Sequence, residues 1–119
     1  MNDYMLFFML DQETEASPED IAKVDCVALI SRFIKDLMEK GQVKSCYGLD
    51  TNGKNFVSRK GKVIDGPFAE TKELILGYIE FRATDEEEAR AIAASTPTIP
   101  YGFKVELRPI VRILDFDIP

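Results

Sequence analysis

Histidine is absent from this chain of 119 residues, and cysteine occurs only twice. The lack of histidine excludes Ser-His-Asp and Cys-His catalysis, a histidine general base and histidine metal ligands. Any acid–base chemistry must therefore use Asp, Glu, Lys, Tyr or Cys. Cys26 and Cys46 are too few and too far apart for a zinc site. Because each lies in an apolar pattern, two buried, reduced thiols are favoured over a disulfide or a nucleophile.

Long apolar runs and an excess of positive charge are also missing. The longest unbroken apolar run covers residues 4–10, whereas a membrane helix needs roughly 20 residues. Fifteen basic and 21 acidic residues give a net charge of −6, so the surface repels nucleic-acid phosphates. The N-terminus carries neither the basic region nor the apolar stretch of a secretory signal. We therefore expect a cytoplasmic protein that binds neither membranes nor nucleic acids.

The composition is typical of one soluble globular domain, spanning residues 1–119. Hydrophobic residues make up 45% of the chain and charged residues 30%, which is too apolar for a disordered segment. A chain of this length buries roughly 65% of its unfolded surface on folding, so it can build a core of its own. The sequence shows no internal repeat and no low-complexity tract.

A strand over residues 4–10 and one long helix are predicted first. Ser17 can cap the helix, Pro18 suits its first position, and Gly41 ends it after about Lys40. Apolar residues recur at three- and four-residue steps and form its buried stripe. This stripe consists of Cys26, Val27, Ile30, Phe33, Ile34 and Leu37.

A meander of short strands is predicted to follow the helix, over residues 43–49, 55–58 and 63–64. Asn52-Gly53 and Lys60-Gly61 are the turns between these strands. Asp65-Gly66-Pro67-Phe68 breaks the meander, because Asp, Gly and Pro are turn-forming residues.

The remaining chain adds a strand over residues 74–82, a short helix and a strand over residues 103–111. A capping box formed by Thr84 and Glu87 predicts the start of this helix. The complete order predicts an α+β fold, a ferredoxin-like sandwich (βαββαβ) with an inserted β-hairpin.

The sheet of such a fold has a second face that two helices cannot cover. The strand over residues 4–10 is apolar on both sides, and the strand over 74–82 repeats this pattern. If this face were exposed to water, its apolar area would be larger than the apolar patches that monomers usually expose. A homodimer whose sheets pack face to face is the simplest explanation; a monomer covered by its tail or loops is the alternative.

The last strand predicts charge on this second face. Lys104, Glu106 and Arg108 alternate with apolar residues and share one side, while Glu80 lies on the same side as Tyr78 in the neighbouring strand. Aromatic residues beside a few converging charges suit a small-molecule pocket. A solvated edge strand explains the same pattern equally well. We expect Arg108 to meet Glu106 or another acidic residue, such as Asp65, Glu70 or Glu80.

Residues 63–73 read Val-Ile-Asp-Gly-Pro-Phe-Ala-Glu-Thr-Lys-Glu and form the most distinctive segment. As local chemistry, Asp65 is a turn former and the charges after it a solvated loop. As a whole, however, the segment resembles the signature of the YCII-related family, in its DGPF-domain branch. Gly77-Tyr78, the helix start at 85–89, the segment 105–110 and the Met- and aromatic-rich opening strand support the resemblance.

The resemblance implies a dimeric α+β barrel with a cleft that holds the motif aspartate, Asp65. Relatives in the superfamily include small cofactor-free enzymes that act on cyclic or aromatic compounds. DGPF-type domains also occur linked to sigma-factor regulation. Some YCII relatives pair the aspartate with a histidine, and because this chain has none, that mechanism does not transfer.

Three functional hypotheses follow. The first is a lyase or isomerase that moves a proton on a cyclic organic acid, with Asp65 as acid or base and no cofactor or metal. Tyr78 or Glu106 would donate or orient a proton, and Arg108 would hold the substrate carboxylate.

Phe68 and Glu70 complete the substrate contacts predicted under this first hypothesis. The second hypothesis is a non-catalytic ligand-binding or transcription-linked regulatory dimer that uses the same cleft. A purely structural dimer is a third possibility. Lys60-Gly61-Lys62 is too short to form a phosphate-binding loop.

Overall fold

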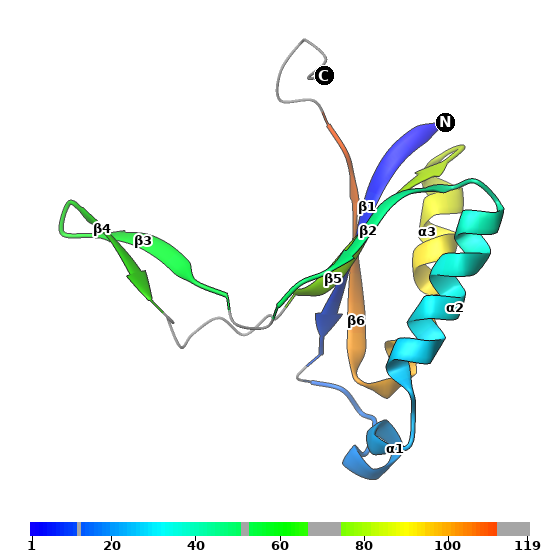
Figure 1. Cartoon of the computed structure of the whole chain (residues 1–119), viewed down its shortest axis with the longest axis horizontal. Coiled ribbons are helices and arrows are strands. Elements are labelled where there is room, and N and C mark those ends of the chain that lie inside the picture. Colours follow the sequence, from blue (N-terminus) through cyan, green and yellow to red (C-terminus); the bar gives the residue numbers. More distant parts are fainter. Residues whose placement is uncertain (12, 51–52, 67–74, 112–119) are drawn as a thin grey trace.

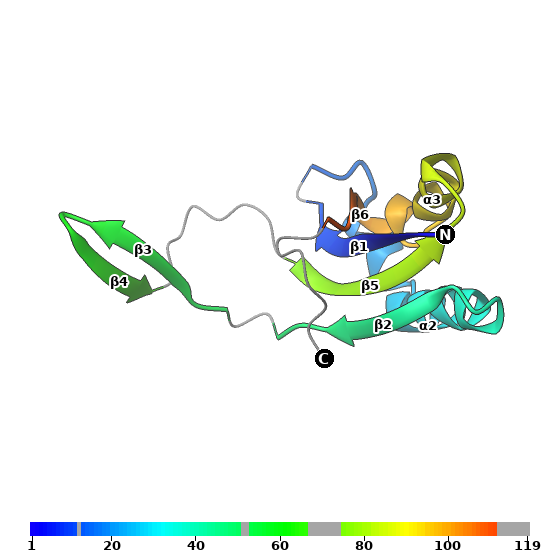
Figure 2. The same cartoon turned by 90° about the horizontal axis from the view of Figure 1, so that it is seen from above.

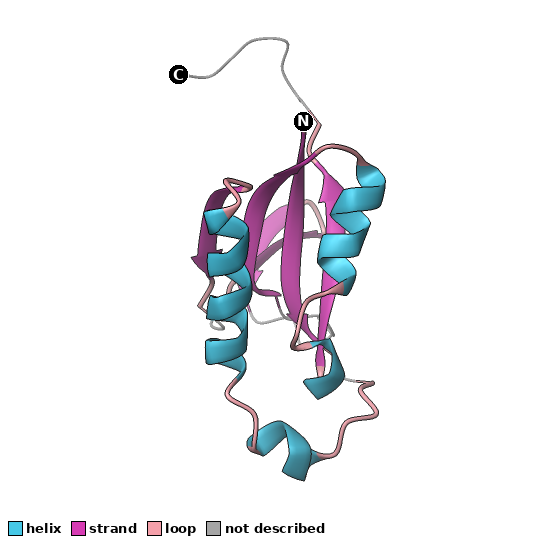
Figure 3. Cartoon of the chain, turned by 90° about the vertical axis from the view of Figure 1, so that its right-hand side faces the viewer, coloured by secondary structure: helices cyan, strands magenta, loops and turns pink. Residues whose placement is uncertain are grey.

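The computed structural model describes residues 1–11, 13–50, 53–66 and 75–111 of the chain. Its main sheet is antiparallel, with strand order β2-β5-β1-β6. The strands are β1 (Asn2–Leu10), β2 (Val43–Gly48), β5 (Ile75–Ala83) and β6 (Phe103–Pro109). Helices α2 (Cys26–Glu39) and α3 (Glu86–Ala94) cover one face of this sheet (Figure 1 and Figure 3). The predicted ferredoxin-like α+β fold is confirmed.

The core lies between the two helices and the two central strands, β1 and β5. Alternate residues of β1 face the helices, and the register sets Leu6 opposite Ile79 and Tyr4 opposite Phe81. Leu6, Ile79 and Phe81 are fully buried, and the rings of Tyr4 and Phe81 stack with centroids 5.8 Å apart. Burial of each large apolar side chain contributes roughly 1.5–3 kcal/mol. The side chains that β1 and β5 bury against the helices therefore contribute a large part of the free energy of unfolding.

The prediction of one long helix after β1 is wrong, because the chain forms two. α1 (Pro18–Ala22) begins as predicted, with the Asp20 amide donating to Ser17 Oγ at 3.1 Å. The chain then leaves helical geometry, and Asp25 caps α2 by accepting from the Ala28 amide at 3.0 Å. An Asp side chain that bonds the backbone in this way favours a helix start over a helix interior.

The buried stripe of α2 is narrower than predicted. Val27 is 77% exposed, whereas Ile30, Phe33 and Ile34 pack against the core and Leu37 is buried. The predicted end of the helix is confirmed, since Gly41 has a φ of +70° and its amide donates to the Met38 carbonyl at 2.9 Å.

The third α-helix, α3, also starts one residue later than its predicted capping box. Asp85 is the cap, and its side chain accepts from the Glu88 amide at 2.9 Å. Thr84 instead donates its hydroxyl to the Glu88 carboxylate at 2.9 Å. A short 3-10 turn, η1 (Ile99–Tyr101), then leads into β6.

The inserted hairpin forms a two-stranded sheet of its own, made of β3 (Asn55–Arg59) and β4 (Lys62–Gly66). Lys60 and Gly61 join them with φ values of +53° and +78°, the positive values that a type I′ turn requires. The predicted meander is wrong, because β2 pairs with β5 while β3 pairs with β4.

Figures 1 and 2 show this hairpin standing apart from the main sheet. β4 continues through Asp65 and Gly66, where a break was predicted. Pro67 and Phe68, like Asn52 of the predicted first turn, lie outside the described residues.

Candidate functional site

A cavity of about 390 Å³ lies between α2 and the end of the sheet where β2 ends and β5 begins. Its apolar lining consists of Phe8, Val27, Ile30, Ile34, Leu76 and Phe103. Its polar lining consists of Cys26, Ser31, Cys46 and Thr98, and Tyr47 and Tyr78 border it as well. None of the described residues that line it is Asp, Glu, Lys or Arg. The cavity therefore offers an apolar interior with a few uncharged polar groups.

Two glycines form part of the lining of this cavity. Gly48 and Gly77 are paired across β2 and β5, and both line the cavity. A Cβ atom added at Gly77 would lie 2.7 Å from the Tyr47 carbonyl oxygen, which is closer than real Cβ atoms approach. A glycine inside a strand commonly marks such a close backbone approach. The missing side chains leave part of the cavity floor as bare backbone.

The two cysteines are both free and both line this cavity. Burial, followed by the nearby Asp25 carboxylate, raises the pKa of the Cys26 thiol. Because the thiolate is the reactive form, this shift leaves Cys26 a weaker nucleophile than an ordinary thiol. The expectation of two buried thiols is wrong, since Cys26 is only half-buried and Cys46 is exposed.

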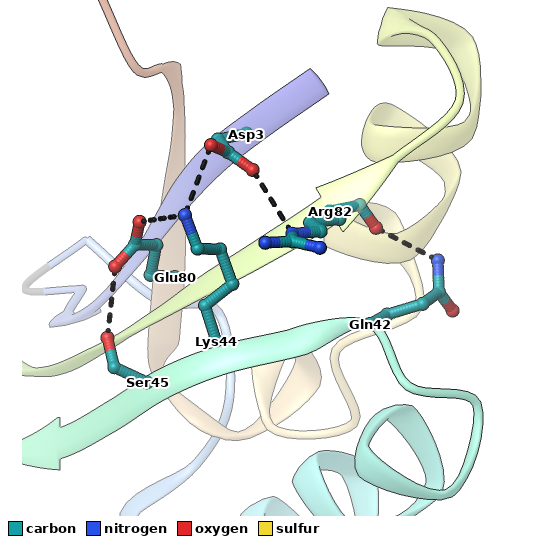
Figure 4. Close-up of polar contacts among 6 residues, drawn as sticks. All are labelled: Asp3, Gln42, Lys44, Ser45, Glu80 and Arg82. Atoms are coloured by element: carbon teal, nitrogen blue, oxygen red, sulfur yellow. Dashed lines mark hydrogen bonds and ion pairs between the residues drawn. The ribbon is translucent and has the colours of Figure 1, made fainter. Parts of the chain in front are cut away.

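The other face of the sheet, which we call the open face, divides as predicted into an apolar part and a charged part. In the charged part, Lys44 Nζ lies 3.2 Å from Asp3 Oδ2 and 3.4 Å from Glu80 Oε2 (Figure 4). Arg82 Nε lies 3.6 Å from Asp3 Oδ1, and the Ser45 hydroxyl lies 3.2 Å from Glu80 Oε1. Hydrogen bonds to Asp3 and then to Glu80 raise the pKa of the Lys44 ammonium group.

A β-bulge brings Lys44 to this cluster. The register between β2 and β5 shifts between Val43 and Ser45, so the residue between them falls outside the regular alternation. Glu80 was predicted on this face from the alternation of β5, and Arg82 follows the same alternation. Asp3 and Lys44 were not predicted, although Asp3 is opposite Arg82 in the register. A bulge cannot be located from the period of a strand, so the sequence gives no signal for Lys44.

The predicted residues of β5 and β6 lie on the open face. The rings of Tyr78 and Tyr47 are in contact, with centroids 5.9 Å apart. Arg108 Nη2 lies 3.2 Å from Glu106 Oε1, the first of the partners expected for it. These two side chains are 66% and 46% exposed, so they form a surface ion pair. Tyr78 therefore borders the cavity, whereas Glu106 and Arg108 lie on the outer strand.

The structure does not bring Asp65 together with these residues within one chain. The backbone of Asp65 lies in β4 opposite Phe56, on the hairpin that stands apart from the sheet (Figure 2). Phe68 and Glu70, the other predicted substrate contacts, lie outside the described residues. The role predicted for all three residues stays a prediction.

The fold and the cavity together define a small α+β domain with room for a ligand. The model of the YCII-related domain family matches residues 5–114, which is nearly the whole chain. The chain therefore belongs to the YCII-related family, and the DGPF branch stays a prediction. No curated protein matches the chain.

Among the described helices, none combines the length and the apolar character needed to cross a membrane. Within the same residues, no group of three or more His, Cys, Asp or Glu side chains is placed to hold a metal ion.

Proposed function

We propose that this YCII-related domain binds a compact, mostly apolar organic molecule in the cavity between α2 and the sheet. The cavity itself is the observation that carries this proposal. Its volume of about 390 Å³ falls within the range of roughly 300–1,000 Å³ typical of ligand pockets. A molecule of one or two rings fits this space.

The lining favours a neutral ring over a charged one. A carboxylate placed deep among Phe8, Ile30 and Ile34 would lose its hydration without gaining a partner, which is costly. A hydroxyl or carbonyl group, by contrast, suits the hydroxyls of Ser31 and Thr98. An organic acid would have to keep its carboxylate at the rim, where Cys46 is exposed.

The more specific proposal is a cofactor-free lyase or isomerase that moves a proton on a cyclic organic acid. Asp65 would be its acid or base, and the resemblance of residues 63–73 to the DGPF signature supports this role. Tyr78 would donate or orient the proton: it borders the cavity, and its side chain lies on the open face of the sheet. The alternative is a regulatory domain that binds the same ligand without converting it, and the uncharged lining favours it.

We further propose that the domain works as a homodimer whose open faces pack together. Met5 and Phe7 of β1 and Tyr78 of β5 are only half-buried on this face, and Tyr47 is 64% exposed. In a dimer with two-fold symmetry, the open face of each copy would pack against the open face of the other, so the same surface is buried on both.

Thermal unfolding of the whole chain against a panel of neutral and acidic cyclic compounds tests the binding proposal. A binder raises the melting temperature, and the shift grows with the logarithm of its concentration above the dissociation constant. Cys46→Phe should block the rim and abolish the shift, whereas the matched Cys46→Ser, which adds no bulk, should keep it. If no compound stabilises the wild type, or if Cys46→Phe binds as well as Cys46→Ser, the cavity is not the site.

Turnover of a compound that binds separates the enzyme from the regulator. Asp65→Asn removes the proposed acid or base while it preserves the size of the side chain. Loss of turnover with binding retained supports catalysis. A ligand that binds and is never converted by the wild type supports the regulatory alternative.

A further inference from the structure

The β3–β4 hairpin differs in charge from the rest of the chain. Residues 54–66, which we call the arm, contain four basic residues and one acidic residue, a net charge of +3. The whole chain has a net charge of −6, so the remaining residues carry −9. The basic residues Lys54, Arg59, Lys60 and Lys62 are all exposed. The arm is thus a basic element on an acidic protein.

The arm also exposes apolar side chains. Phe56 is 67% exposed and Val63 is 76% exposed. The register sets Phe56 opposite Asp65 and Ser58 opposite Val63, so Phe56 and Val63 belong to one side of the hairpin. A two-stranded hairpin alone is marginally stable at best in water. Among the described residues, β3 and β4 pair only with each other, so the hairpin gains stability when this side is covered.

We propose that the arm docks on a second copy of this chain. A second copy suits the arm in two ways. The residues of that copy outside its own arm are acidic overall, whereas the arm is basic. The proposed dimer also brings the second copy close to the arm. Complementary charge steers two such surfaces together and fixes how they meet. The arm's apolar side would then be buried on its partner. This inference rests on the homodimer proposed above and adds a second contact to it.

The docking would also relocate the motif aspartate. The backbone of Asp65 is opposite Phe56 in the register of the hairpin. The arm of one copy would therefore carry Asp65 toward the other copy rather than toward its own cavity. The complete site would then combine the cavity of one copy with the aspartate of the next, which explains why one chain does not bring them together.

Sedimentation equilibrium of the full chain tests the arm with two kinds of variant. Lys60→Glu with Lys62→Glu reverses its charge, and Phe56→Ser with Val63→Ser removes its apolar side. Each should raise the dimer dissociation constant by roughly tenfold or more. Lys23→Glu with Lys40→Glu makes the same charge change at exposed sites outside the arm, and Val111→Ser removes an equally exposed valine that does not line the cavity. Both controls should change the constant less than about twofold.

Salt and cross-linking provide independent readouts. Added salt should weaken the wild-type dimer, and this dependence should shrink in the Lys60→Glu, Lys62→Glu variant. A photo-reactive benzoylphenylalanine in place of Phe56 should cross-link to a peptide of the other copy, giving a band at twice the 13.5 kDa chain mass. Cross-links within one chain alone would overturn the proposal.

Tyr47→Asp separates failure of the arm from failure of the dimer. Tyr47 is exposed on the open face, so a charge there should disrupt packing of the sheets without unfolding the chain. If Tyr47→Asp weakens the dimer while the arm variants do not, the arm inference falls and the dimer stands. If the wild type is a monomer at micromolar concentration, both fall. If the protein is a monomer and binds DNA only when the arm lysines are present, the arm is a nucleic-acid contact instead.

Discussion

The two faces of the main sheet are built from the same strands and differ in what lies over them. In β1, Tyr4 and Leu6 point to the helices and are buried, while Met5 and Phe7 point the other way and are half-buried. Both sets are apolar, so residue type alone does not decide burial. An apolar strand face therefore indicates that the face is to be buried. It does not indicate whether a helix of the same chain or a second copy buries it.

The largest expected effect concerns the core of the covered face. Phe81→Ala removes a fully buried ring that stacks on Tyr4, and it should cost about 3–5 kcal/mol of unfolding free energy. Phe7→Ala on the open face should cost less than half as much when the chain is dilute. Urea unfolding of both variants checks this. A loss at Phe7 that grows with protein concentration would show that a second copy covers the open face.

A smaller effect is expected where β2 and β5 approach most closely on the covered face. Gly77→Ala forces a methyl group against the Tyr47 carbonyl and should cost roughly 1–3 kcal/mol. Gly48→Ala is the control, because its Cβ would make only an ordinary contact at 3.9 Å. Chemical denaturation should therefore rank Gly77→Ala well below Gly48→Ala in stability. Equal stabilities would contradict the origin proposed for the cavity.

The helix that covers this face depends on its cap. Asp25→Ala leaves the Ala28 amide without its side-chain acceptor and should cost about 1 kcal/mol. Asp25→Asn keeps an acceptor oxygen and should be nearly neutral. Thermal unfolding of the pair measures the difference. If both variants lose the same stability, the carboxylate charge rather than the hydrogen bond holds the helix start.

The smallest effect is expected on the open face, at the ion pair of β6. Arg108→Ala removes a partner of Glu106 from a largely exposed position and should cost at most about 1 kcal/mol. A cost of roughly 3 kcal/mol or more would show that the pair is buried in the assembled protein. Denaturation at two protein concentrations distinguishes the cases. A near-zero change would also leave Arg108 without support as a binding residue.

The elements that could be predicted are those whose signal is local or periodic. The doubly apolar β1 and the Lys60-Gly61 turn were recognisable, and so was the pairing of Arg108 with Glu106. The break before α2 was missed because Asp25 fits the polar side of a continuous helix as well as it fits a cap. The partner of β2 was also missed, because a turn signal shows where a chain reverses and not which strands pair.

The site was harder to predict than the fold, for a physical reason. Tyr78 was predicted because its side chain can do chemistry, and its role stays a prediction. The cavity beside Tyr78 owes its shape to side chains that are missing, at Gly48 and Gly77. Gly77 was noticed only as part of a resemblance, although a glycine inside an apolar strand is itself a signal of close approach.

The glycine at position 77 also limits how this domain can diverge. Any larger residue there meets backbone, which cannot move aside as a flexible side chain can. The backbone at Gly77 is therefore a fixed part of the cavity floor, whereas Ile30 and Ile34 on the opposite wall belong to a helix whose side chains can change in size. If the proposed binding function is right, relatives that share the glycine but accept a different molecule should differ along α2. Adaptation to a new ligand would then leave this part of the floor unchanged.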